Sequence, residues 1–107
     1  MGSRKKDRRH EIVLGDGSRA DILYLRTSSH PAEYALILRR IEGSERVAVI
    51  CADNSHLDHH VDGHHLHRYR EDRKGPPEPL PFPVTDANDA MHKIIDWMAD
   101  NWEELIR

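Results

Sequence analysis

A cluster of prolines divides the chain and limits its fold more than any other feature. Five of the six prolines lie within residues 75–83, in the string GPPEPLPFP. Proline lacks a backbone N–H and fixes φ near −65°, so this segment cannot form a helix or a central strand. We therefore expect an extended surface connector, with different kinds of secondary structure before and after it.

Before the connector, short β-like runs alternate with turn residues. The runs cover 10–14, 20–26, 33–41, 46–53 and 64–70. The Asp16-Gly17 pair tolerates the positive φ of a tight hairpin turn between the first two runs. The fourth run contains VAVICA, which is apolar on both faces and so belongs in the middle of a sheet.

After the connector, the spacing of apolar residues predicts one long helix. Thr85 or Asp86 caps its start, and the helix runs from Ala87. The apolar residues recur every three or four positions: Met91, Ile94, Ile95, Met98, Trp102 and Leu105. Such a helix covers one face of a sheet. The predicted fold is α+β, with about five antiparallel strands and a long C-terminal amphipathic helix packed on one face.

Length and charge predict one domain with a basic tail. The chain has 107 residues, of which 37% are hydrophobic and 33% charged, so the core is small and leaves room for a partner or a homodimer. Residues 1–9 carry five basic side chains against one acid and are expected to be disordered, which leaves 10–107 as the domain.

Hydropathy and cysteine content predict a cytoplasmic protein without membrane contact. The longest apolar run has six residues, whereas a membrane span needs about 20. The basic start has no hydrophobic stretch behind it, as an export signal would. A single cysteine, Cys51, excludes an intrachain disulfide and is expected to be a small buried side chain.

Six of the nine histidines fall within twelve residues: His56, His59, His60, His64, His65 and His67. Imidazole exchanges protons near neutral pH and is a common metal ligand, so the cluster indicates proton transfer or metal binding. On a strand, His65, His67 and Tyr69 would share one face, with His64 and Arg68 on the other.

The first interpretation of the His65 and His67 pair is acid–base catalysis on RNA. His65 and His67 can stand on either side of a phosphodiester, where one accepts the 2′-hydroxyl proton and the other protonates the departing 5′-oxygen. Asp53 would orient one ring, and Tyr69 could replace one acid or orient the substrate. Four arginines are candidates for holding the phosphate: Arg39, Arg40, Arg68 and Arg70. This chemistry requires no cofactor.

Two alternatives remain open. In the first, His59, His60 and His64 join the pair in a Zn or Ni site, although the spacing matches no zinc-finger or helical zinc motif. In the second, the protein is a non-enzymatic interaction domain whose helix and Trp97 bind a partner, and the histidines are solvated or structural.

The order of these features resembles the TumE-like toxins of bacterial toxin–antitoxin systems. The matching elements are Asp53-Asn54, His59-His60, His65-x-His67 with Arg68-Tyr69, Pro81-Phe82 and the terminal helix. The resemblance implies a growth-inhibiting toxin that acts on RNA, encoded beside a helix-turn-helix antitoxin that binds both the toxin and operator DNA. Here the loop between Asn54 and His65 is longer than in that pattern.

Overall fold

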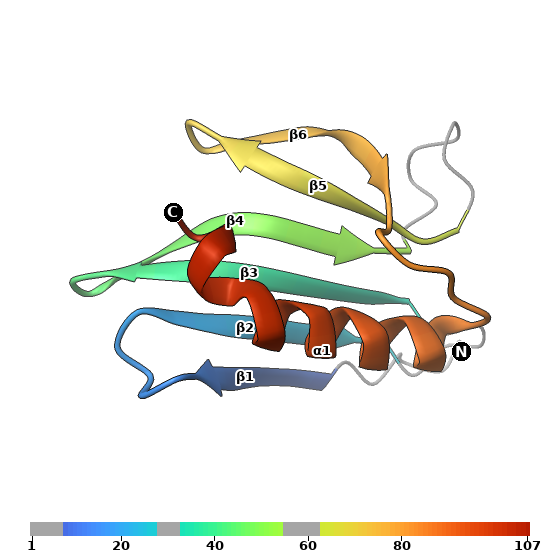
Figure 1. Cartoon of the computed structure of the whole chain (residues 1–107), viewed down its shortest axis with the longest axis horizontal. Helices are drawn as coiled ribbons and strands as arrows, with labels where there is room; N and C mark the ends of the chain where they lie inside the picture. Colours follow the sequence, from blue (N-terminus) through green and yellow to red (C-terminus); the bar gives the residue numbers. More distant parts are fainter. Residues whose placement is uncertain (1–7, 28–32, 55–62) are drawn as a thin grey trace, which may run out of the picture.

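Six strands form a single antiparallel sheet, and one helix follows at the C-terminal end (Figure 1). The computed structural model describes residues 8–27, 33–54 and 63–107. The strands lie side by side in chain order, as β1 Arg8–Leu14, β2 Ala20–Arg26, β3 Tyr34–Glu42, β4 Glu45–Asp53, β5 His65–Arg70 and β6 Arg73–Pro79. The helix α1 is Ala87–Leu105, and Asp86 caps its start by accepting a hydrogen bond from the Asp89 backbone N–H.

The sequence prediction of an α+β fold is confirmed, but the predicted number of five strands is wrong. β6 occupies the first part of the proline-rich connector and contains Pro76, Pro77 and Pro79. It lies at the edge of the sheet and has only one neighbouring strand, β5. A proline without an N–H therefore loses no hydrogen bond to a second strand. β1 includes Arg8 and Arg9, which the sequence assigned to the tail, while residues 1–7 lie outside the described residues.

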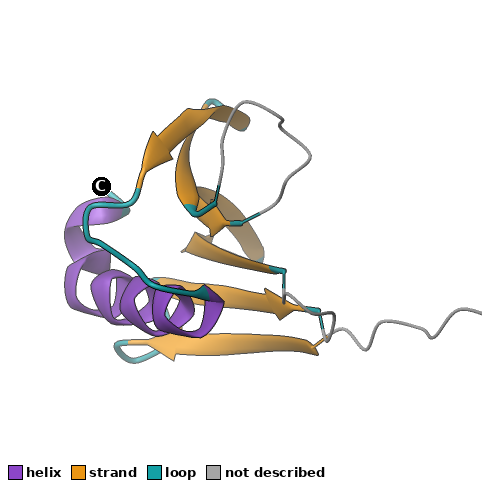
Figure 2. Ribbon diagram, turned by 90° about the vertical axis from the view of Figure 1, so that its right-hand side faces the viewer, coloured by secondary structure: helices purple, strands orange, loops and turns teal. Residues whose placement is uncertain are grey.

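The core lies between α1 and one face of the sheet (Figure 2). The helix packs mainly over β3 and β2. It buries Ala90, Met91, Ile94 and Met98. The sheet contributes Ala20, Ile22, Leu36, Leu38, Ile50, Ala52 and Leu66. Trp97 lies beside this core, with its ring edge-on to Phe82 at a centroid distance of 6.3 Å.

The strand register decides which side chains face away from the helix. Ala52 on β4 pairs with Leu66 on β5, and both are in the core under α1. Because side chains alternate along a strand, Cys51 and Asp53 on β4 and their partners His67 and His65 on β5 lie on the opposite face. No helix within the three described ranges is long and apolar enough to cross a membrane.

Candidate active site

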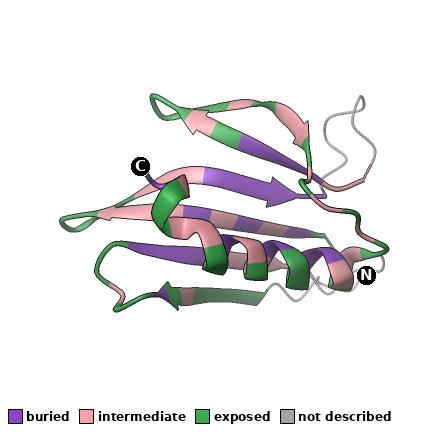
Figure 3. Ribbon diagram, viewed as in Figure 1, coloured by how far each residue is buried: buried purple, intermediate pink, exposed green. Residues whose placement is uncertain are grey.

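Three buried polar side chains meet where β4 ends and β5 begins. Figure 3 colours these ends of the two strands as buried. Asp53 is 5% exposed, His65 3% and His67 6%. One carboxylate oxygen and one nitrogen from each ring lie within 4.8 Å of one another. The two imidazole rings meet edge-to-face, with centroids 4.8 Å apart. The alternation of β5 therefore brings together the two histidines that the sequence pairs, with Asp53 beside them.

Backbone contacts fix the ring of His67. Its Nδ1 lies 2.8 Å from the carbonyl oxygen of Gly75 on β6, which can only accept a hydrogen bond. Nδ1 therefore carries the proton, and Nε2 of the neutral ring has an available lone pair. Within the described residues, Nε2 has no hydrogen-bond partner. Every fully buried side-chain nitrogen or oxygen there does have a partner, so Nε2 is not fully buried and solvent reaches it.

His65 is held from both sides. Its Nε2 lies 2.8 Å from Oδ1 of Asp53, and its Nδ1 lies 3.2 Å from the carbonyl oxygen of Gly63. Both ring nitrogens therefore face oxygen acceptors. Only the doubly protonated ring can donate to both, in a charge-assisted pair with the carboxylate. The site thus combines one imidazole with an available lone pair and one positioned to carry an extra proton.

Two further side chains contact Asp53: Lys74, which sequence reasoning did not assign to the site, and Cys51, which it named as one candidate for a third metal ligand. Lys74 on β6 places Nζ 3.5 Å from Oδ2 of Asp53. Burial disfavours the lysine charge, but the charge and hydrogen bond of Asp53 favour it, and the pKa of Lys74 is raised. Sγ of Cys51 lies 3.6 Å from the same oxygen. Burial and the Asp53 charge raise the pKa of Cys51 to about 12, so it remains a neutral thiol.

The other predicted site residues differ in how closely they approach the cluster of Asp53, His65 and His67. Tyr69 pairs with Lys74 across the β5–β6 hairpin, and burial together with the nearby Cys51 raises the pKa of its phenol. His64 is not brought to the cluster, because its Nδ1 bonds to the Tyr34 hydroxyl at 2.7 Å. His59 and His60, proposed as metal ligands, lie outside the described residues.

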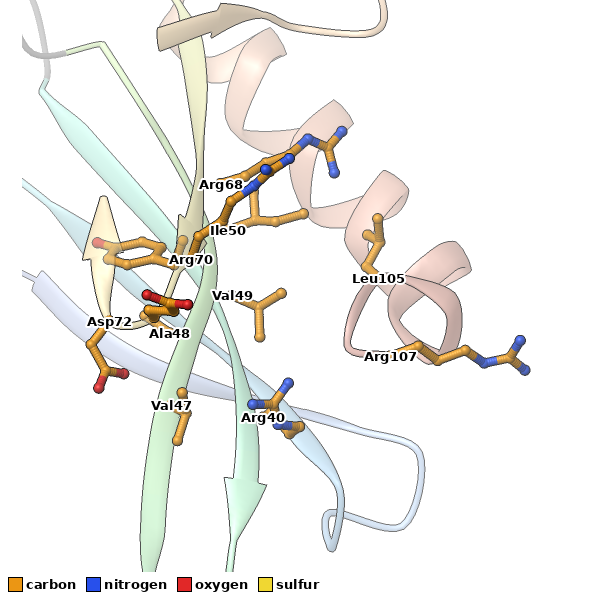
Figure 4. A pocket seen from close by; sticks show the side chains of 12 residues that line it. Arg40, Val47, Ala48, Val49, Ile50, Arg68, Arg70, Asp72, Leu105 and Arg107 are labelled. Atoms are coloured by element: carbon orange, nitrogen blue, oxygen red, sulfur yellow. The ribbon is translucent and has the colours of Figure 1, made fainter. Parts of the chain in front are cut away.

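The predicted phosphate-binding arginines are not brought to the histidine pair. Arg40, Arg68 and Arg70 line a pocket of about 290 Å³ with Arg107, which we call the helix-side pocket (Figure 4). Arg68 and Arg70 alternate with the histidines along β5, so they point to the opposite face of the sheet. Arg39 is instead held 2.7 Å from Asp21, in an ion pair on β2 and β3.

A second pocket reaches Asp53 itself. It has a volume of about 430 Å³, and we call it the Asp53 pocket. Three arginines line it: Arg8 and Arg9 on β1 and Arg26 on β2. None of the three forms an ion pair within the part of the chain that the structure describes. Sequence reasoning assigned Arg8 and Arg9 to a tail and placed Arg26 in the second strand without giving it a role.

Comparison of the chain with protein-family models, with curated proteins and with solved structures gives no match. The function is therefore argued from the geometry of the site and from the sequence pattern that forms it.

Proposed function

We propose that the protein is a toxin that cleaves RNA, with His65 and His67 as its acid–base pair and Asp53 holding His65. The observation that carries the proposal is the fixed tautomer of His67. Its Nδ1 bonds to the carbonyl of Gly75, which leaves the lone pair of Nε2 available, and its ring lies against the ring of His65, which is paired with Asp53. Transesterification of RNA requires a proton acceptor at the attacking 2′-oxygen and a proton donor at the departing 5′-oxygen of one phosphate, and the two rings offer one of each.

In the proposed reaction, Nε2 of His67 takes the proton from the ribose 2′-hydroxyl. The 2′-oxygen then bonds to phosphorus while the bond from phosphorus to the 5′-oxygen breaks. His65 opens its contact with the Gly63 carbonyl and gives the Nδ1 proton to the departing 5′-oxygen, while Asp53 keeps hold of Nε2, and the products are a 2′,3′-cyclic phosphate and a 5′-hydroxyl. Lys74, whose Nζ lies 3.5 Å from Asp53, supplies the cation that binds the phosphate oxygens. The sequence analysis had proposed arginines for this role.

The resemblance to TumE-like toxins supports the same function. Its most specific elements, the Asp-Asn pair and the His-x-His element, supply the residues of the site, Asp53, His65 and His67. On this proposal the physiological partner is a helix-turn-helix antitoxin, whose binding stops the toxin from acting on RNA.

A growth assay tests the proposal. Induced expression of the parent chain in a bacterial host is expected to stop growth, and His67→Ala is expected to restore it, since that variant has no proton acceptor. The matched control is His92→Ala, because His92 is exposed on α1 and on the other side of the sheet. If His67→Ala, expressed and folded as well as the parent, remained equally toxic, the assignment would be wrong.

A divalent-metal centre is the second candidate, and a separate observation favours it. Nδ1 of His65 and of His67 each face a backbone carbonyl, the arrangement usual for histidines that bind a metal through Nε2. With Asp53 they form a two-histidine, one-carboxylate set of the kind that binds Zn²⁺ or Fe²⁺ and leaves positions open for water. The sequence suggested a site in which the His65 and His67 pair is joined by His59, His60 and His64, with Asp53 among the candidates for a third ligand.

Metal titration separates the two candidates. A metal centre predicts stoichiometric binding of Zn²⁺ or Ni²⁺ by calorimetry, a higher melting temperature with the ion, and loss of both effects in Asp53→Asn. Retention of full RNA cleavage after dialysis against EDTA would instead exclude a catalytic metal and support acid–base chemistry by the imidazoles alone.

A further inference from the structure

We propose that the Asp53 pocket binds the phosphates of single-stranded RNA next to the bond that is cleaved, through Arg8, Arg9 and Arg26. This inference rests on the proposed function and adds the path of the substrate to it. It also moves phosphate binding from the helix-side pocket to the pocket that Asp53 lines. Arg9 lies there on the face of the sheet that carries His65 and His67, whereas Arg8 and Arg26 are the adjacent pair in the register and line the pocket from the end of β1 and β2.

The strand register connects the pocket to the site. Arg9 on β1 pairs with Leu25, Leu25 with Ala35, Ala35 with Asp53, and Asp53 with His65. These five residues form one row across five strands, on the same face of the sheet. Neighbouring strands are about 4.8 Å apart, so the Cα atom of Arg9 lies roughly 14 Å from that of Asp53. An extended strand of a few nucleotides covers this distance, across the strands of the sheet.

The charges in the pocket favour a polyanion. Its three arginines lack carboxylate partners among the described residues, and its acidic lining is limited to Glu33 and Asp53. Guanidinium groups without partners present their N–H donors in the geometry that phosphate accepts. The helix-side pocket differs, because Arg40 there pairs with Glu42 and Arg68 with Glu78.

The apolar part of the lining favours a single strand. Leu25 and Ala35, both half-buried, form the floor between Arg9 and Asp53. An apolar floor bordered by cations suits unpaired bases with their flanking phosphates, whereas a duplex keeps its bases paired and stacked inside.

The test measures binding of a labelled single-stranded RNA by fluorescence anisotropy, on a His67→Ala background that prevents cleavage. Replacing Arg8, Arg9 and Arg26 by Ala is expected to raise Kd at least tenfold. It is also expected to flatten the slope of log Kd against log salt by about 2, the value for three lost phosphate contacts on a single strand. The matched control replaces Arg68, Arg70 and Arg107, which removes the same charge from the helix-side pocket and is expected to change Kd less than threefold.

Cleavage kinetics on the otherwise unchanged protein complete the test. The Arg8, Arg9 and Arg26 triple variant is expected to raise KM and to leave kcat close to that of the parent, because these residues bind substrate away from the reacting atoms. Equal weakening of binding by the two triple variants would contradict the inference, since general charge attraction explains that result.

The inference and the proposed function can fail separately. If the protein cleaves RNA and the changes at Arg8, Arg9 and Arg26 leave its KM unaffected, the proposed function stands and the proposed role of the Asp53 pocket is wrong. If the protein binds RNA through these arginines but does not cleave it, the role of the Asp53 pocket stands and the catalytic proposal is wrong.

Discussion

Gly75 is the residue on which the position of His67 most directly depends. A Cβ atom at Gly75 would lie 2.6 Å from the carbonyl oxygen of Arg68, so the β5–β6 pair has room only for glycine there. The same residue supplies the carbonyl that fixes the tautomer of His67. One backbone position thus controls both the pairing of two strands and the chemistry of a side chain.

Gly75→Ala is therefore expected to reduce RNA cleavage by at least tenfold and to lower the free energy of unfolding by about 2 kcal/mol, as measured by urea denaturation. Gly43→Ala is the control. Its Cβ would meet nothing within 4 Å, although its φ of 63° imposes a backbone cost of about 1 kcal/mol. Parent-level cleavage by Gly75→Ala would show that the contact with Gly75 does not position His67.

The buried carboxylate of Asp21 on β2 links three strands, because it contacts one arginine on β3 and one on β4. Its carboxylate accepts hydrogen bonds from Arg39 at 2.7 Å and from Arg46 at 2.9 Å. Burial opposes the charge of Asp21, but the hydrogen bonds from both arginines outweigh burial and lower its pKa below the usual 3.8. A lowered pKa in the folded state means that this stabilisation is present above about pH 4 and is lost as the pH falls through the folded-state value.

Asp21→Asn is expected to lower the free energy of unfolding by about 2 kcal/mol at pH 7, because Arg39 keeps a buried guanidinium with weaker acceptors. The difference between the variant and the parent should shrink below pH 4, when Asp21 of the parent becomes protonated. Urea denaturation at pH 7 and pH 3 measures it, with the exposed Asp96→Asn as control. A difference that stayed constant with pH would contradict the role given to the Asp21 charge.

At the scale of elements, periodicity predicts most of the fold. Short β-like runs between turn residues mark the first five strands and three- to four-residue spacing marks the helix, and the predicted ends differ from the observed ones by no more than two residues. β6 was missed because proline disfavours strands in general, and only the position at the sheet edge makes its three prolines tolerable. Neighbours in space, which the local sequence does not reveal, decide that position.

The β5–β6 turn offers a test of local strain. Glu71 and Asp72 form a two-residue turn between the paired Arg70 and Arg73, and both have positive φ, 52° and 64°. Asn-Gly suits this geometry better than Glu-Asp. We expect Glu71→Asn with Asp72→Gly to raise the free energy of unfolding by about 1 kcal/mol in urea denaturation. A loss of stability would show that the side chains of Glu71 and Asp72 contribute more than their backbone strain costs.

At the scale of the whole molecule, the sequence predicted the side chains of the candidate site better than their surroundings. Asp53, His65 and His67 could be grouped because strand alternation places His65 and His67 on one face and Asp53 ends the preceding strand. The arginines could not be placed, because nearness in sequence to the histidines puts Arg68 and Arg70 on the wrong face. Lys74 and Arg9 reach the site through the pairing of β6 and β1, which depends on the assembled sheet.

Cleavage of a single-stranded RNA by the purified protein in the presence of EDTA tests the central claim most directly. The proposed chemistry predicts products that end in a 2′,3′-cyclic phosphate and a 5′-hydroxyl. It also predicts that His67→Ala lowers the rate at least a hundredfold while its melting temperature stays near that of the parent. Cleavage that disappears with EDTA, or that persists at the parent rate in His67→Ala, would contradict the account.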